Sequence, residues 1–296
     1  MRLLLFLITN LLVVCTISVV LSLLTRLGLL PPDLPLLPLA GGCFLWGMAG
    51  AWLSLQFSAA SAKGMMGVQV LDPRQDHWLV ATVASLAQRA GLPMPEVGIY
   101  DSPEWNAFAT GPSPEKALVA VSSGILEGMP APELEAVLAH ELSHVGNGDM
   151  VTMTLLQGVV NAFVMFLARA IVILLPRSER DGDRQPPPPT ALIWPLELLL
   201  GIAGSLVTAG FSRHREFRAD AGAARLTGPA AMAGALARLG QASGAVDRRD
   251  GGRLNAFKIS VPDGWLSLFA SHPPLEARIR ALQALEPGGS ATAWLR

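Results

Sequence analysis

Four long apolar runs constrain the fold of this chain more than any other feature of its sequence. They occupy residues 3–24, 34–62, 151–175 and 190–212. A helix needs about 20 apolar residues to cross the hydrocarbon core of a bilayer, and each run is long enough to do so. We therefore predict four transmembrane helices. Two lie in residues 1–62, joined by a short loop, and two form a hairpin in residues 151–212.

The composition agrees with a membrane protein that has a modest water-facing part. Hydrophobic residues make up 51% of the chain and charged residues only 15%, whereas a soluble domain carries about a quarter charged residues. The net charge of −1 offers no basic surface for nucleic acid, so we expect membrane lipid and not nucleic acid as a partner. The two cysteines, Cys15 and Cys43, lie in apolar runs and form neither a disulfide framework nor a CxxC metal site.

Two charged residues interrupt the third and fourth runs. Arg169 and Glu197 would lie at similar depth if the two runs form a hairpin. Charges inside a span are costly and are usually paired or placed near an end. Two arrangements are therefore open: the two side chains pair with each other, or each extends separately to the nearer interface.

Four spans would place both termini, residues 63–150 and residues 213–296 on the same side of the membrane. The basic residues that flank the spans on this side are Lys63, Arg213, Arg215 and Arg218. The short first loop on the other side offers only Arg26, although the second loop has three arginines. The positive-inside rule then favours the cytoplasm for the water-facing part, in a multi-pass protein of a bacterial inner membrane.

The two water-facing pieces are each too small for a robust core, but together they have the size of one domain. In residues 63–150 the pattern predicts a helix over about Asp76–Arg89, closed by Gly91, and a later helix that starts at Pro132 and ends at Gly146 and Gly148. Short strands are predicted between these helices, near Val97–Tyr100, Ala107–Thr110 and Leu118–Val121.

Residues 213–296 are predicted to be mostly helical. The helices are expected over Arg213–Leu226, Pro229–Gln241 and Pro274–Leu285, with a turn or mobile loop at 247–252. The predicted fold is thus an α-helical membrane protein with four transmembrane helices. It also has a mainly helical α+β zincin-like domain assembled from two chain segments, 63–150 and 213–296.

The sequence HELSH, His140 to His144, matches the HExxH metal-site motif. Residues i and i+4 share one face of a helix, so both histidines can reach one ion, and Glu141 can orient and deprotonate a water molecule there. The alternative is a pair of histidines on the surface of an amphipathic helix. That alternative is weakened because the chain has only five histidines and two of them have this spacing.

A catalytic zinc ion needs a third protein ligand and an open fourth position. The longer HExxHxxGxxH pattern is absent, and the strongest remaining stretch is FSRHREFRADAGAARL, Phe211 to Leu226. Within it Glu216 and Asp220 share a helix face, whereas His214 points to nearly the opposite side. We favour Glu216 as the third ligand. Asp220 either accepts a hydrogen bond from a ligand histidine or forms a surface salt bridge with Arg213 or Arg215.

The chain resembles the M48 family of zinc metalloproteases over nearly its whole length. The matching motifs are NAFATG (106–111), LVAVSSGIL, HELSHVGNGDM, FSRHREFRADAG and SHPPLEARI (271–279). The resemblance implies that His140, His144 and Glu216 bind one zinc ion per chain and that Glu141 is the catalytic base. It also implies a role in membrane-protein quality control on the cytoplasmic side. The family's prenyl-protein branch has more spans, so its enclosed chamber is not expected here.

The resemblance also gives meaning to two further positions. NAFATG would be an edge strand beside the site, where Asn106, Ala107 and Phe108 bind an extended substrate; the alternative is an ordinary strand followed by a turn. His272 resembles a histidine that donates to the developing oxyanion; the alternative is a polar residue at a helix start before Pro273. Arg278 is expected to be structural only.

These inferences predict a zinc endopeptidase that cleaves damaged or misfolded membrane proteins at the cytoplasmic membrane surface, with polypeptides as substrates. The main rival is a non-catalytic membrane zinc protein that acts as a chaperone or scaffold. Glu141 argues against this rival because a purely structural zinc site needs no carboxylate there. The sequence leaves the oligomeric state open.

Overall fold

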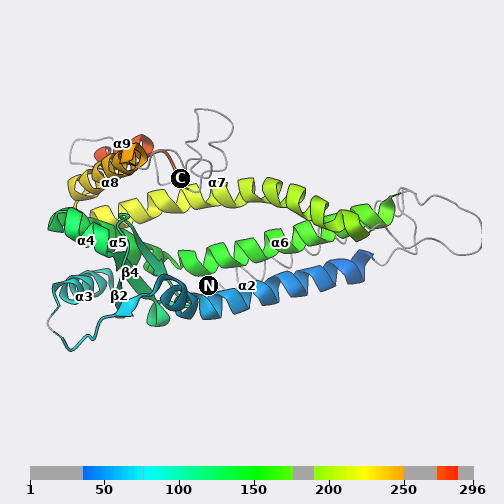
Figure 1. The fold of residues 1–296 in the computed structure, drawn as a ribbon, viewed down its shortest axis with the longest axis horizontal. Coiled ribbons are helices and arrows are strands. Elements are labelled where there is room, and N and C mark those ends of the chain that lie inside the picture. The colour runs from blue at the N-terminus through cyan, green and yellow to red at the C-terminus, as the bar shows by residue number, and fades with distance from the viewer. Residues whose placement is uncertain (1–35, 76, 176–189, 250–271, 286–296) are drawn as a thin grey trace, which may run out of the picture. The chain divides into compact units, whose positions relative to one another are not determined.

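The structure is a computed structural model that describes residues 36–75, 77–175, 190–249 and 272–285 (Figure 1). The chain divides into two compact units. The first unit comprises Met1–Leu53 and Thr154–Val207, and the second comprises Ser54–Met153 and Thr208–Arg296. Most of the described residues are helical, and the second unit also contains a small sheet.

Three of the described helices are long and apolar enough to cross a membrane. They are α2 (Leu36–Met66), α6 (Asp149–Leu174) and the stretch Thr190–Thr227, which joins the short helix η2 (Thr190–Leu192) to α7 (Ile193–Thr227). These helices correspond to the second, third and fourth predicted spans. The first predicted span, residues 3–24, lies outside the described residues, so the count of four stays a prediction.

Small residues let the spanning helices of the first unit pack closely. A Cβ atom added at Gly47 of α2 would lie 2.8 Å from the carbonyl oxygen of Gly158 on α6. A Cβ atom at Gly158 would lie 2.7 Å from the Cβ of Ala51. Close backbone approach through small residues is the usual mode of helix association in lipid, where burying apolar surface gives little driving force.

The charges inside the third and fourth spans form an ion pair. Nη1 of Arg169 donates to Oε1 of Glu197 at 2.5 Å and to the carbonyl oxygen of Met165 at 3.0 Å. Of the two arrangements that the sequence left open, the pairing is the one the structure has.

The sheet of the second unit has four strands in the order β1-β2-β4-β3. The strands are β1 (Gln69–Val70), β2 (Glu96–Tyr100), β3 (Ala107–Thr110) and β4 (Leu118–Ser122). β2 and β4 are parallel, and the outer strands β1 and β3 pair antiparallel with them. The three predicted strands are confirmed, and β3 is an edge strand as expected. β1 escaped prediction because two residues carry no periodic pattern.

The helices of the second unit largely follow the sequence signals. They are α3 (Trp78–Ala90), α4 (Ser123–Gly128), α5 (Ala131–Asn147), the end of α7, α8 (Pro229–Arg249) and α9 (Leu275–Gln283); a short helix η1 covers Pro114–Lys116. Gly91 ends α3 and Gly148 ends α5, both in the left-handed conformation that glycine adopts at low cost.

Three details of the predicted helices were wrong. Gly146 lies inside α5, so Gly148 alone ends that helix, since only Gly148 has a positive φ. Residues 247–249 of the predicted turn or loop are helical, and residues 250–252 lie outside the described residues. Helix α4 was not predicted, because one and a half turns are too short for a periodic pattern.

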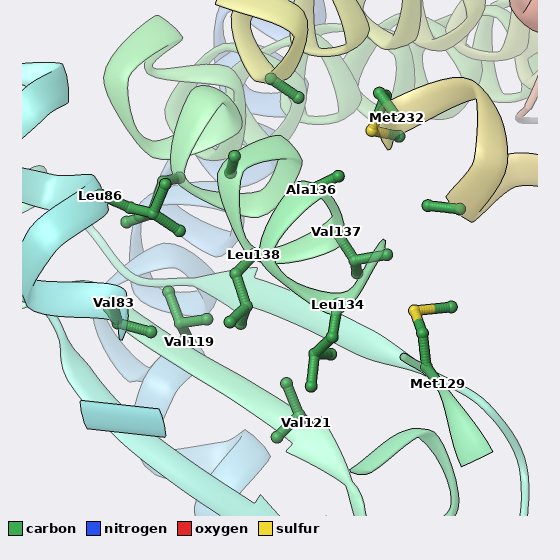
Figure 2. Packing of buried hydrophobic residues seen from close by; sticks show 14 of the residues in the cluster. Val83, Leu86, Val119, Val121, Met129, Leu134, Ala136, Val137, Leu138 and Met232 are labelled. Atoms are coloured by element: carbon green, nitrogen blue, oxygen red, sulfur yellow. The ribbon is translucent and has the colours of Figure 1, made fainter. Parts of the chain in front are cut away.

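Helix α5 is held by the hydrophobic core of the second unit. Its Leu134 and Leu138 are buried against Val119 and Val121 of β4, as Figure 2 shows. Full burial of one such side chain stabilises the fold by about 1.5–3 kcal/mol. Packing of α3, the sheet and α8 around α5 therefore gives this helix a firm position in the fold.

Candidate metal centre

Two buried histidines lie one turn apart on α5. His140 and His144 are 6% and 8% exposed, and their Nε2 atoms are 3.1 Å apart. The alternative of two surface histidines is therefore wrong. The apolar side of α5 packs into the core and fixes the helix, so both rings are presented on the same face.

Helix α7 brings a carboxylate to this histidine pair. Oε2 of Glu216 lies 3.5 Å from Nε2 of His140, and Oε1 lies 3.4 Å from Nε2 of His144. The three candidate ligand atoms all lie within 4.8 Å of one another. Glu216 is 1% exposed, and its Oε1 has no hydrogen-bond partner.

This donor set fits a metal ion. Two imidazole nitrogens and one carboxylate oxygen are a common protein ligand set of catalytic zinc. A buried carboxylate oxygen without a hydrogen bond is costly, and a cation at this point would satisfy it. His140, His144 and Glu216 therefore form a possible metal site.

A glycine allows α7 to approach α5. A Cβ atom added at Gly222 would lie 2.8 Å from the Cβ of Ser143 on α5, closer than real Cβ contacts. The neighbouring residues Ala219 and Ala223 are fully buried. This close crossing, one to two turns beyond Glu216, brings the carboxylate of α7 within reach of the histidines.

A carboxylate lies against the other ring nitrogen of each histidine. Nδ1 of His144 is 2.8 Å from Oδ2 of Asp149, in the first turn of α6. Nδ1 of His140 is 3.0 Å from Oδ1 of Asp220, although the N–H does not point along the line to that oxygen. Such contacts fix the tautomer and orientation of a metal-binding histidine. The sequence analysis missed Asp149; the signal was an acidic residue five positions after His144, at the turn between two helices.

Arg278 on α9 holds Asp220 in place. It donates from Nε to Oδ2 at 2.8 Å and from Nη2 to Oδ1 at 2.6 Å, and its Nη1 lies 3.5 Å from Oε2 of Glu216. Arg278 and Asp220 are 5% and 2% exposed. The alternative that Asp220 forms a surface salt bridge is therefore wrong. Arg278, expected to be structural only, contacts both Asp220 and Glu216 of α7.

The structure places His272 at the site and His214 away from it. Nδ1 of His272 lies 3.0 Å from Oε2 of Glu216, and its side chain is 63% exposed. His214 is exposed on α7, as expected. Glu141 follows His140 on α5 and is half-buried.

The edge strand β3 packs against α5. Ala107 and Ala109 contact the core around α5, whereas Phe108 faces the opposite side of the sheet and packs on Tyr100. Asn106 is exposed just before the strand, where its backbone pairs with Ser122. In the described residues, β3 has a pairing partner on one side only.

The carboxylates dominate the electrostatics of the centre. Burial lowers the pKa of His144, but Asp149 and Glu216 outweigh this effect and raise the pKa to about 9. Burial likewise opposes the charge on Glu216, yet the neighbouring imidazoles of His140, His144 and His272 hold the pKa of Glu216 well below its usual range. Burial raises the pKa of Asp220, but Arg278 and His140 reverse the shift and lower it. The centre therefore attracts cations, whether protons or a metal ion.

Comparisons with known proteins agree on one family. The model of peptidase family M48 matches residues 73–286. The chain is 47% identical to Protease HtpX of Aeromonas hydrophila over 292 residues, covering 95% of this chain and 99% of that protein. It is 48% identical to Protease HtpX of Pasteurella multocida over 290 residues, covering 97% and 99%.

A solved structure shares the fold. The crystal structure of S. mikatae Ste24p superimposes with a TM-score of 0.61 at 22% sequence identity. The match covers 82% of this chain but only 58% of that protein.

Proposed function

The chain belongs to peptidase family M48 and is a metallopeptidase, and we propose that it is a membrane-anchored zinc endopeptidase that cleaves damaged or misfolded membrane proteins at the cytoplasmic surface of a bacterial inner membrane. One observation carries the proposal. The ligand-type atoms of His140, His144 and Glu216, from two helices far apart in sequence, lie within 4.8 Å of one another.

The proposed roles follow from these positions. Nε2 of His140, Nε2 of His144 and a carboxylate oxygen of Glu216 would hold the metal ion. When bound, zinc supplies Lewis-acid chemistry: it polarises the substrate carbonyl and makes a nearby water molecule more acidic. Asp149 and Asp220 orient the two imidazoles through their Nδ1 atoms.

Glu141 is the proposed general base and acid. It takes the proton from the attacking water molecule and delivers it to the leaving amine nitrogen, so that the peptide bond breaks without free amide anion or hydroxide. The exposed ring of His272 donates a hydrogen bond to the carbonyl oxygen of the substrate as negative charge develops there.

The edge strand β3 is the proposed binding site for the substrate backbone. An extended peptide can add to an edge strand by main-chain hydrogen bonds, and β3 packs against the helix that carries the two histidines. Asn106, Ala107 and Phe108 are the residues we assign to this contact. A peptide must be extended to bind in this way, so loops and unfolded segments are the expected substrates.

The location follows from the apolar helices and the flanking charges. Three described helices are able to cross a membrane, so the enzyme is anchored there. The basic residues Lys63, Arg213, Arg215 and Arg218 favour a cytoplasmic position for the peptidase segments. We therefore propose that cleavage takes place at the cytoplasmic face.

The test is hydrolysis of an unfolded protein such as casein by detergent-purified enzyme, with zinc content measured in parallel. The substitution Glu141→Ala keeps all three proposed ligands and should lower kcat by about 10²–10⁴-fold while zinc is retained. The control Glu135→Ala, which removes a half-buried carboxylate on the same helix that pairs with Arg89, should change neither value. Zinc binding without hydrolysis by the wild-type enzyme would favour the scaffold alternative instead.

A further inference from the structure

A cavity of about 630 Å³ opens in the first unit beside the Arg169–Glu197 ion pair. Its volume falls within the range of about 300–1,000 Å³ that is typical of small-molecule sites. The described residues that line it are Trp46, Met165, Arg169, Thr190, Ala191, Ile193, Trp194 and Glu197. The cavity thus combines one cationic side chain, one anionic side chain and two indole rings with one threonine and three apolar residues.

The ion pair lies near the ends of the two spanning helices that carry it. Arg169 lies five residues before the end of α6 at Leu174. At 1.5 Å per residue this separation is about 8 Å along the helix. Glu197 lies seven residues after Thr190, the start of the spanning stretch, or about 10 Å from that end. A lipid headgroup reaches this depth, whereas the middle of the acyl chains lies deeper.

The two charged side chains remain open to a ligand although they contact each other. Their side chains are 32% and 23% exposed, for Arg169 and Glu197 respectively. The guanidinium has five N–H donors, and its Nη1 donates to both Glu197 and the carbonyl oxygen of Met165. Both charges therefore line the cavity and lie side by side in its wall.

The two tryptophan side chains that line the cavity are largely exposed. Trp46 is 74% exposed and Trp194 is 79% exposed. Tryptophan prefers the level of the headgroups, where an apolar ring with one polar atom is best accommodated. The face of an indole also attracts ammonium groups.

We propose that this cavity binds the headgroup of a zwitterionic phospholipid, with its phosphate at Arg169 and its ammonium group at Glu197 and the indole rings. The lining carries one positive and one negative charge, so a simple anion would meet Glu197 and a simple cation would meet Arg169. A zwitterion satisfies both, and arginine pairs with phosphate through strong charge-assisted hydrogen bonds. A bound lipid would anchor the α6–α7 hairpin in one leaflet.

The first test is native mass spectrometry of the full-length protein in detergent with equal amounts of phosphatidylethanolamine and phosphatidylglycerol. The wild-type protein should retain one phosphatidylethanolamine with at least a fivefold preference. The double substitution Arg169→Met with Glu197→Met removes both charges together, so neither is left unpaired in the membrane, and should abolish the preference. Equal retention of the two lipids by the wild type, or an unchanged preference in the double variant, would overturn the proposal.

A matched pair of tryptophan variants distinguishes the loss of a cavity contact from a general folding defect. Trp194→Leu keeps the ion pair and removes one indole from the cavity, so retention should fall at least threefold. Trp52→Leu removes an exposed indole of α2 that does not line the cavity, and retention should stay unchanged. Equal losses in the two variants would show that the lipid binds elsewhere.

The second test identifies what occupies the cavity. The photo-crosslinking residue p-benzoylphenylalanine replaces Trp194 in protein that is kept in native-lipid nanodiscs. We expect an adduct with the mass of one zwitterionic phospholipid. A crosslink to a peptide from residues 1–35, or to a second copy of the chain, would mean that protein fills the cavity and would overturn the proposal.

Discussion

At the residue scale, each imidazole of the candidate metal centre has its Nδ1 atom against a carboxylate. Asp149 lies against Nδ1 of His144, and Asp220 lies against Nδ1 of His140. A carboxylate at Nδ1 holds the proton on that nitrogen and leaves the Nε2 lone pair free for a metal ion. The two carboxylates differ in their own contacts. Asp220 accepts a hydrogen bond from Arg278, whereas Asp149 lies in the first turn of a helix.

Removal of the Asp149 carboxylate should weaken metal binding. We expect Asp149→Ala to lower zinc affinity by about 10–100-fold, because His144 loses the acceptor that orients its ring. Asp149→Asn, which keeps an acceptor oxygen but no charge, should lose less. The measurement is competition with a chelator of known affinity. Asp72→Ala, a loop carboxylate of the same unit, is the control, and a loss of equal size there would refute the assignment.

Removal of the Arg278 guanidinium should destabilise the fold. In Arg278→Met, the buried Asp220 loses both hydrogen bonds of that pair, and an uncompensated buried charge typically costs about 3–5 kcal/mol. The melting temperature in detergent should therefore fall. The double variant Arg278→Met with Asp220→Asn should recover part of the loss, since it leaves no unpaired charge. An equal or larger loss in the double variant would contradict this explanation.

At the element scale, the close crossing of α5 and α7 determines whether Glu216 reaches the histidines. We expect Gly222→Ala to push α7 away from Ser143, because the added methyl group would lie 2.8 Å from the Cβ of that residue. Overpacking of this kind typically costs about 1–3 kcal/mol, and the displaced carboxylate should also lower zinc affinity.

The control for this prediction is Gly234→Ala on α8. There the nearest atom to an added Cβ would be 3.6 Å away, an ordinary contact. Alanine is a better helix former than glycine, so this variant should be as stable as the wild type or slightly more so. Zinc affinity is measured with the chelator assay, and unaltered affinity in Gly222→Ala would show that α7 does not need this close approach.

At the scale of the whole molecule, the candidate metal centre joins two distant segments of the second unit. His140 and His144 come from Ser54–Met153, and Glu216 comes from Thr208–Arg296. A ligand that binds only the folded state stabilises it, by about 4 kcal/mol at a concentration 1,000 times its Kd. Chelation of the metal should therefore lower the melting temperature of the second unit, and added zinc should restore it. A melting temperature that does not respond to chelator would contradict a shared site.

The sequence determined the parts of this protein that depend on local patterns. Apolar runs longer than about 20 residues identify spans, and the spacing of His140 and His144 places both on one helix face. Strands β2, β3 and β4 follow from their β-branched and aromatic residues between turn signals. The set of candidate ligands, including Glu216, could also be named because its members lie in short motifs.

Only the tertiary structure decided which of these elements meet and which partner each charged group takes. The pairing of Arg169 with Glu197 and of Asp220 with Arg278 joins residues 28 and 58 positions apart. No local period links such residues; their contact depends on helix crossings such as that at Gly222. The support of His144 by Asp149 depends in turn on the left-handed turn at Gly148. Periodicity shows on which face of its own helix or strand a residue lies. The packing between elements decides what that face contacts.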